Sequence, residues 1–266
     1  MIDLHSHVLP GLDDGATGIE GSVEMAREAV ACGITSLAAT PHVRDDYPTT
    51  ANEMLTALAA VRHAIHDAGI DLDVLPGAEI AFDQLHALDL DDLRPFALGG
   101  SPNHLLIELP FFGWPLDTAD QLRRLREMGY TAVLAHPERN SAVQESPQRL
   151  AGLVDAGALV QLTAASITGG FGAAAERSSK TLLSAGLAHL VATDTHRAHG
   201  RGTSFVPALE SLRDPALARW LTRDVPAAIV EGARCPTRPV TKTGWLGKRL
   251  HRATMASRPT ILRKPA

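Results

Sequence analysis

Short apolar runs alternate along this chain with longer segments of helical spacing, and this alternation constrains the fold more than any other feature. No hairpin turn joins two runs directly, which predicts parallel strands connected through helices. The runs are Ile2–Val8, Thr35–Val43, Leu72–Phe82, His104–Pro110, Thr131–Pro137, Leu159–Ser166 and His189–His196. Because no Gly-rich nucleotide motif follows a run, we expect an α/β fold built as a seven-stranded (β/α) barrel rather than an open doubly wound sheet.

Glycines mark the ends of the helical segments. A glycine just past a helix adopts the left-handed cap without steric cost, and five stand between a helical pattern and the next apolar run: Gly33, Gly69, Gly129, Gly157 and Gly186. Apolar residues at three- and four-residue spacing predict helices over Glu20–Ala31, Asn52–Ala68, Thr118–Met128, Pro147–Ala156 and Ala173–Ala185. One or two closing helices are expected within Pro207–Gly232.

The composition is that of an ordinary globular protein, with 45% hydrophobic and 21% charged residues among 266. Two isolated cysteines, Cys32 and Cys235, are too few for a disulfide framework or a thiolate metal site. No signal-peptide-like or membrane-spanning stretch is present, so we expect a cytoplasmic protein.

Charge is distributed unevenly between the body of the chain and its end. No acid follows Glu231, whereas nine basic residues do, so the body carries about −14 against −5 for the whole chain. We therefore divide the chain into a domain at 1–240 and a basic tail at 241–266. The tail is expected to be disordered and solvated, with contact to an anionic membrane or an acidic partner as the alternative. No nucleic acid partner is expected, and the oligomeric state stays open.

Two histidines near the start of the chain suggest metal chemistry. Strand side chains have a period of two, so Asp3, His5 and His7 point to one face of the first run. Two imidazoles converging on one face, with acids just beyond, are typical of a metal site. A histidine pair on a solvated edge strand is the plainer alternative.

The remaining strands argue for the metal site. Metal-type side chains recur at the carboxyl ends of the runs, where the active sites of barrels gather: His5, His7, His42, Glu79, Glu108, His136, Asp194 and His196. His104 and His189 begin their runs instead, at the opposite end of the barrel, and are expected to be structural.

The donor set favours a multinuclear site. Nitrogen and oxygen donors without sulfur suit Mn, Fe, Co or Zn. With Asp14, the acids and histidines exceed one coordination sphere, which predicts two or three divalent ions, and closely spaced ions clamp a phosphoryl group and generate hydroxide from water. Asp3 could support a ligand or serve as a structural acid.

Seven motifs in chain order carry a family resemblance. They read DLHSHVLPGLDDGA, ATPH, PGAEI, LLIELPF, AHPERN, QLTAASITGGFG and ATDTH. Together they resemble the polymerase and histidinol phosphatase (PHP) superfamily, and specifically its bacterial metal-dependent protein-tyrosine phosphatases of capsule and exopolysaccharide clusters. The resemblance spans roughly residues 1–201.

The resemblance implies a distorted seven-stranded barrel with a trinuclear site, for which Mn is the first choice. By the family pattern the three ions would be held by His5, His7, Glu79 and Asp194; by Glu79, Glu108 and His136; and by Asp14, His42 and His196. Arg139 and Arg201 match the family's phosphate-handling arginines, with Arg197 as an alternative to Arg201. The plainer alternative for Arg139 is a surface arginine paired with the adjacent Glu138. The implied substrate is the phosphotyrosine-containing tail of a tyrosine autokinase that controls polysaccharide export.

Other readings compete with this one. Histidinol-phosphate phosphatase shares the superfamily, although AHPERN and QLTAAS resemble the tyrosine phosphatases. A metal-dependent amidohydrolase would not need the arginines, and an inactive PHP scaffold would be expected to have lost ligands. A cysteine-dependent phosphatase is excluded, because the C-x5-R pattern fails at both cysteines: Ala38 and Thr241 stand where arginine is required.

Overall fold

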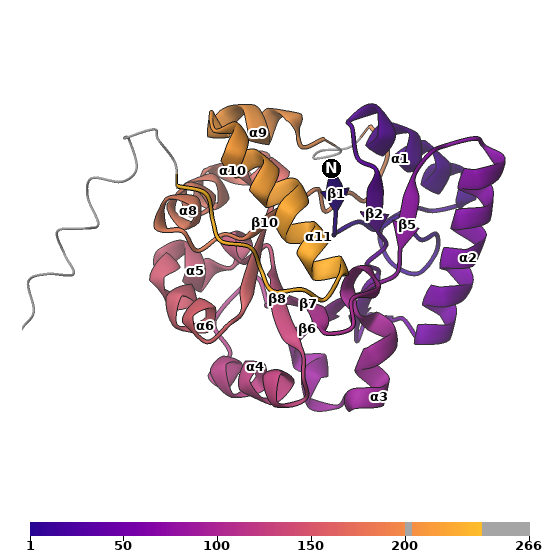
Figure 1. Ribbon diagram of the computed structural model, residues 1–266. Helices are drawn as coiled ribbons and strands as arrows, with labels where there is room; N and C mark the ends of the chain where they lie inside the picture. Colours follow the sequence, from indigo (N-terminus) through magenta and orange to yellow (C-terminus); the bar gives the residue numbers. More distant parts are fainter. Residues whose placement is uncertain (200–203, 241–266) are drawn as a thin grey trace, which may run out of the picture.

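The computed structural model describes residues 1–199 and 204–240, and its strands form the predicted barrel (Figure 1). Arg201 and the predicted tail at 241–266 lie outside the described residues. The parallel strands are β1 (Ile2–Asp3), β2 (Ser36–Ala38), β3 (His42–Arg44), β5 (Asp73–Leu75), β6 (Glu79–Ala81), β7 (His104–Glu108), β8 (Thr131–Ala135), β9 (Leu159–Thr163) and β10 (Leu190–Ala192). A short strand, β4 (Tyr47–Pro48), pairs antiparallel with β3.

The order of the strands follows the chain around the barrel. One sheet has the order β1-β2-β5 and the other β10-β9-β8-β7-β6-β3-β4. The last predicted run closes on the first, because His7 N donates to Thr195 O at 2.8 Å and Asp194 N donates to His5 O at 2.9 Å. Asp3 reinforces this closure by accepting hydrogen bonds from the backbone N–H and the hydroxyl of Thr193. The predicted seven-stranded barrel is confirmed.

Two prolines explain why the barrel is distorted. The second predicted run is divided into β2 and β3 around Pro41, and the third into β5 and β6 around Pro76. Proline has no N–H to donate to a ladder, so regular pairing breaks at these positions. Ala39 N then donates to Leu75 O, whereas Thr40 N donates to Ser6 O on the other side. The second run therefore bends between its two neighbouring strands, just before His42.

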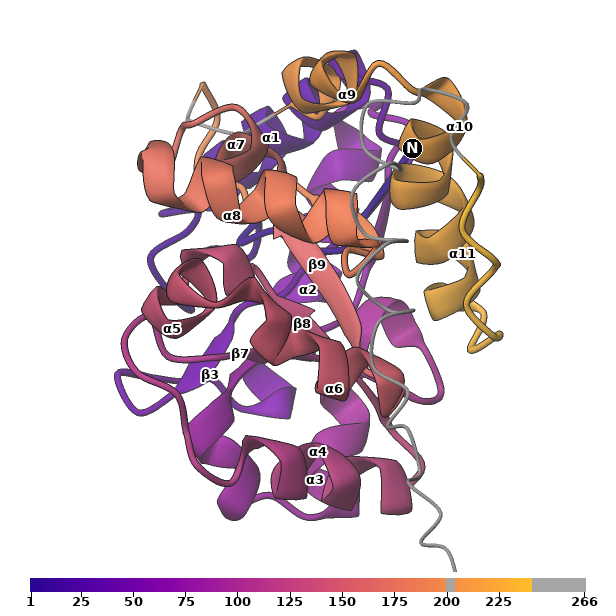
Figure 2. The same ribbon diagram turned by 90° about the vertical axis from the view of Figure 1, so that its left-hand side faces the viewer.

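Helices surround the strands (Figures 1 and 2). They are α1 (Ile19–Ala31), α2 (Ala51–Asp67), α3 (Leu90–Leu93), α4 (Thr118–Glu127), α5 (Ser141–Glu145), α6 (Ala151–Asp155), α7 (Ala164–Ile167), α8 (Gly172–Ala185), α9 (Val206–Leu212), α10 (Pro215–Arg219) and α11 (Val225–Val230). The helix predicted over 147–156 is instead a 3₁₀ turn, Pro147–Leu150, followed by α6. All five predicted glycine caps have positive φ. None of the helices within 1–199 and 204–240 has the length and apolar character that a membrane span requires.

Packing follows the apolar spacing of the sequence. In α2 the buried residues recur every three or four positions, at Met54, Leu58, Val61 and Ile65. All five residues of β7 are buried, as expected for a parallel strand covered on both faces. The amino end of the barrel is covered by α11, which packs against β1 and against the turn Leu98–Gly100. The carboxyl ends of the strands lie at the opposite end.

Two histidines lie at the amino end of the barrel, as predicted. His104 begins β7 and His189 stands just before β10. Burial lowers the pKa of His104 to about 4, and burial together with the nearby charge of Arg238 lowers the pKa of His189 to about 4. Within the described residues neither belongs to a cluster of converging donors.

His104→Gln is expected to weaken the dependence of stability on pH below neutrality. The folded-state pKa of about 4 lies below the ordinary value of 6.5, so the unfolded chain binds more protons between these values. The free energy of unfolding of the wild type should therefore decrease as the pH falls through this window, by up to about 1.4 kcal/mol per pH unit for this residue. Urea unfolding at about pH 7 and pH 5 measures the effect. His63→Gln, on an exposed face of α2, is the matched control, and an unchanged pH dependence in His104→Gln would contradict the assignment.

Candidate metal centre

The loop after the first strand is folded tightly around His7. Asp13 Oδ2 lies 2.7 Å from His7 Nδ1 and accepts from His42 N at 3.0 Å. Gly15 N donates to Asp13 Oδ1, and a side chain at Gly15 would stand 2.1 Å from the His7 carbonyl oxygen, so only glycine fits there. Asp13 therefore fixes the ring of His7 with Nε2 directed into the barrel. The sequence reasoning assigned a role to Asp14 and missed Asp13, although the two are adjacent.

Four donors meet at the centre of the carboxyl end. His5 Nε2 lies 3.2 Å from His7 Nε2, 3.2 Å from Glu79 Oε2 and 3.4 Å from Asp194 Oδ1. His7 Nε2 lies 3.5 Å from Glu79 Oε2 and 3.4 Å from Asp194 Oδ1. Donors bound to one ion at about 2.1 Å stand roughly 3.0–3.4 Å apart. The spacing of His5, His7 and Asp194 fits a single cation between them, with Glu79 Oε2 beside the two imidazoles.

Glu79 extends this cluster toward β7 and β8. Its Oε1 lies 2.8 Å from His136 Nε2, and its Oε2 lies 3.0 Å from His42 Nδ1. Glu108 is farther from both rings, with 3.8 Å from Oε1 to His136 Nε2 and from Oε2 to His42 Nδ1. The two oxygens of Glu79 thus face different groups of donors, as a carboxylate shared between two ions would.

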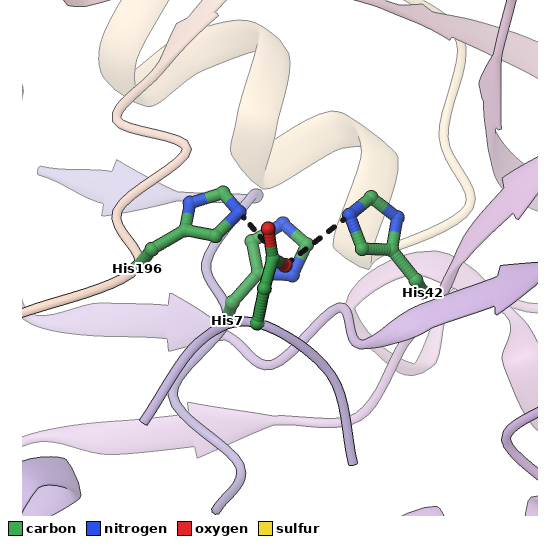
Figure 3. Close-up of side chains that lie close together, drawn as sticks. His7, His42 and His196 are labelled. Carbon is green, nitrogen blue, oxygen red and sulfur yellow. Dashed lines mark ion pairs between the residues drawn. The ribbon is translucent and has the colours of Figure 1, made fainter. Parts of the chain in front are cut away.

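A third group lies toward solvent. Figure 3 shows His7, His42 and His196 gathered around one carboxylate group. The Oδ1 atom of Asp14 lies 3.4 Å from His196 Nε2 and 3.7 Å from His42 Nε2. The Asp14 side chain is 51% exposed, and the ring of His196 stacks on that of His7 with centroids 3.9 Å apart. This group is the most accessible of the three.

The histidines and carboxylates of the cluster shift one another's pKa values. Burial lowers the pKa of His5, but the carboxylates of Glu79 and Asp194 outweigh burial and raise it to about 9. Burial opposes the ionised form of Glu79 as well, yet His5 and His136 hold its pKa well below the usual range. Burial and the charge of Glu79 raise the pKa of Glu108. Excess negative charge is therefore compensated by protonated imidazoles, a role that divalent cations would take over as they displace those protons.

Two of the converging residues have strained backbones. His136 has φ 29° and Asp194 has φ 55°, in the left-handed region that residues other than glycine rarely adopt. Such a conformation costs of the order of 1 kcal/mol and persists where the surroundings enforce it. His136 directly follows β8, and Asp194 follows β10 after one intervening residue. In both places the turn directs the side chain toward the cluster. This use of strain is typical of functional sites.

Other buried polar groups support the donors. Gln161, inside β9, accepts through Oε1 from the ring N–H at His5 Nδ1, at 2.9 Å, and so orients that ring. The sequence reasoning missed Gln161, although a polar residue inside an apolar strand was a usable signal. Asp3 bonds Thr193 and the backbone N–H of His5, and burial raises its pKa to about 6. Asp3 is thus a structural acid at the barrel seam, the second of the two roles considered.

The three candidate arginines differ in position. Arg139, in the turn Pro137–Arg139 after β8, donates from Nη1 to Asp194 Oδ2 at 2.7 Å. A surface pair with Glu138, which the sequence offered as the plainer role of Arg139, is wrong: Glu138 is buried and accepts from Thr163 N at 2.9 Å. Arg197 is exposed. Arg201 falls in the part of the chain that the structure does not describe.

Fold and site together are those of a (β/α) barrel with candidate metal ligands at the carboxyl ends of its strands. Family comparison makes the class specific, because the family described as "Capsular polysaccharide synthesis, CpsB/CapC" matches residues 1–216. The chain belongs to this family, which confirms the predicted resemblance.

Curated relatives agree with the family. The chain is 38% identical to tyrosine-protein phosphatase YwqE of Bacillus subtilis over 76% of this chain and 79% of YwqE. It is 31% identical to the putative tyrosine-protein phosphatase CapC of Staphylococcus aureus over 74% of this chain and 77% of CapC. It is 27% identical to tyrosine-protein phosphatase CpsB of Streptococcus pneumoniae over 76% of this chain and 85% of CpsB.

Solved structures give the same result. A crystal structure from a study of YwqE and CpsB, described there as unique metal-dependent tyrosine phosphatases, superposes with a TM-score of 0.81 at 32% identity, covering 91% of this chain and all of the other. A lactonase from Listeria monocytogenes superposes at 0.51 with 15% identity over 88% of this chain and 92% of the lactonase, which reflects the barrel fold alone.

Proposed function

We propose that this chain is a metal-dependent protein-tyrosine phosphatase whose ions are held at the carboxyl end of its barrel. The observation that carries the proposal is the convergence of nine nitrogen and oxygen donors without sulfur, beside an arginine bound to one of them. The metal-dependent tyrosine phosphatases among its relatives support the same reaction. The proposed ligands are His5, His7, Asp14, His42, Glu79, Glu108, His136, Asp194 and His196.

Three groups of donors would hold two or three divalent ions. We assign one ion to His5, His7, Glu79 and Asp194, a second to Glu79, Glu108 and His136, and a third to Asp14, His42 and His196. This division follows the family pattern. Separations within the groups run from 2.8 to 3.8 Å, and the groups adjoin one another, because His42 Nδ1 also lies 3.0 Å from Glu79 Oε2. Mn is the proposed metal because four of the donors are carboxylates, with Fe, Co and Zn as alternatives.

The chemistry divides between the ions and the protein. Bound divalent ions would polarise the phosphoryl oxygens and lower the pKa of water at the site. Arg139 would donate to the equatorial oxygens of the phosphate, where charge accumulates in the transition state. Its planar guanidinium has donors to spare, since Asp194 takes one of five. A phenolic leaving group, with a pKa near 10, needs less help from a general acid than an alkyl alcohol does.

The substrate follows from the family. We propose that the chain acts on a phosphotyrosine-containing protein, a tyrosine autokinase of capsule or exopolysaccharide export, through the domain at 1–240. The description of the family as one of capsular polysaccharide synthesis supports this choice. The basic tail at 241–266 and the cytoplasmic location stay predictions.

Removal of metal should abolish phosphatase activity. After chelation and dialysis, release of phosphate from a phosphotyrosine peptide is expected to fall to background and to return with Mn, Co or Fe. Histidinol phosphate is tested in parallel and should be the poorer substrate. Full activity in metal-free protein would overturn the proposal.

The double variant Cys32→Ser, Cys235→Ser should keep its phosphatase activity, because both thiols lack the arginine pattern of a phosphate loop.

A further inference from the structure

Aromatic side chains surround the arginine beside the cluster of candidate metal ligands. The Cζ atom of Arg139 lies over the ring of Phe111, 4.7 Å from its centroid, and over the ring of Phe171, 4.4 Å from its centroid. Phe111 follows β7 and Phe171 precedes α8, so two separate loops bring their rings to one side chain. The ring of Phe111 is also nearly parallel to the imidazole of His136, at 17° and 5.9 Å.

Both phenylalanine rings remain accessible. Phe111 is 36% exposed and Phe171 is 38% exposed, whereas Phe82, Phe96 and Phe205 are buried in the core. Phenylalanine is normally a core residue, and exposed rings grouped at one site mark a binding surface. Arg139 covers part of the surface of each ring, and the part that stays exposed is available to a ligand.

The two rings lie where the organic group of a phosphate ester would project. Arg139 binds Asp194, so a phosphate that contacts the guanidinium at the edge of the donor cluster lies next to the phenylalanines. Phe111 and the candidate ligand Glu108 also line a cleft of about 470 Å³, which leaves space for a substrate on the Phe111 side of Arg139; Arg139 and Phe171 do not line it. A flat aromatic group would meet ring surfaces there, whereas a short alkyl group would leave them in water.

We propose that Phe111 and Phe171 are specificity-determining residues that bind the aromatic ring of the substrate, so that this site selects aryl over alkyl phosphate groups. The inference rests on the proposed phosphatase function and adds the residues that select the substrate. Arg139 contributes to affinity for the phosphate of any substrate. The phenylalanines contribute only when an aromatic ring is attached.

Competitive inhibition separates these two contributions. Phenylphosphonate and methylphosphonate share a phosphonate group and differ in the ring, and both are measured as inhibitors of p-nitrophenyl phosphate hydrolysis by the metal-loaded full chain. The wild type should prefer phenylphosphonate by about five- to tenfold. Phe111→Leu and Phe171→Leu, which keep apolar bulk, should each reduce this preference to less than about threefold while methylphosphonate binds as before.

Two further variants complete the test. Arg139→Ala should weaken both inhibitors by a similar factor and leave the preference intact. Phe112→Leu, a neighbouring phenylalanine that is 85% exposed, should change neither inhibition constant. Equal losses for both inhibitors in the leucine variants would show that the rings only support Arg139. A wild type without preference would also overturn the inference, and in both cases hydrolysis by the wild type would leave the phosphatase function standing. Absence of hydrolysis would remove both.

Discussion

Glu79→Ala is expected to reduce turnover of a phosphotyrosine peptide by about a thousandfold and to lose more bound metal than any variant of a peripheral ligand. The reason is the position of its carboxylate between two groups of donors. Oε2 lies 3.2 Å from His5 Nε2, whereas Oε1 lies 2.8 Å from His136 Nε2. Truncation would remove a ligand from two ions at once. Elemental analysis of the purified variant, alongside steady-state phosphate release, measures both losses.

Asp14→Ala is the matched comparison for Glu79→Ala. Asp14 is half-exposed and borders only the outer group with His42 and His196, so its loss should deplete one ion. Glu79→Gln adds a second control, since it keeps the shape of the side chain and removes the negative charge. Similar metal content in Glu79→Ala and Asp14→Ala would contradict the shared position of Glu79. Thermal unfolding without metal checks that each variant is folded.

The sequence predicted the fold well because its signals were local. Apolar runs of strand length, helical spacing between them and a glycine at each of five junctions were enough to predict parallel strands that alternate with helices. The prolines at positions 41 and 76 are plain in the sequence, but their effect depends on strand pairing. The part of the run before Pro41 pairs with β1 and the part after it pairs with β6, which the sequence does not reveal. The closure between Ser6 and Thr195 joins the two ends of the fold, which periodicity cannot reveal.

The site could be predicted in part for a similar reason. The carboxyl ends of all parallel strands lie at one end of the barrel. The place of a candidate donor in its apolar run therefore predicted at which end of the barrel it lies. The hydrogen-bond partners of those donors could not be predicted from position in a run. Gln161 meets His5 across the barrel, and the left-handed turns at His136 and Asp194 redirect two side chains by backbone strain. Lateral contacts and strain of this kind arise only from the folded chain.

Arg139 shows how a lateral contact changes the interpretation of one residue. Sequence proximity suggested an ion pair with Glu138, but a residue after a strand and its neighbour point in different directions, and burial holds Glu138 against Thr163 N. Arg139 instead reaches Asp194, 55 residues away, and lies over two aromatic rings. An arginine held in this way has lost much of its rotamer freedom before substrate binds, which favours a preorganised donor.

Arg139→Ala is expected to keep its full metal content and to lose about a hundredfold or more in turnover, the order expected when a preorganised donor to transition-state charge is removed. The metal content should survive because Asp194 faces the central donors with Oδ1 and Arg139 with Oδ2. Arg139→Lys should recover only part of the activity, since an ammonium group restores the charge without the planar pair of donors. Elemental analysis and steady-state kinetics on both variants separate these effects. Near-normal turnover in Arg139→Ala would assign phosphate binding to Arg197 or Arg201 instead. A parallel loss of metal would mean that Arg139 acts by holding Asp194 in its strained conformation.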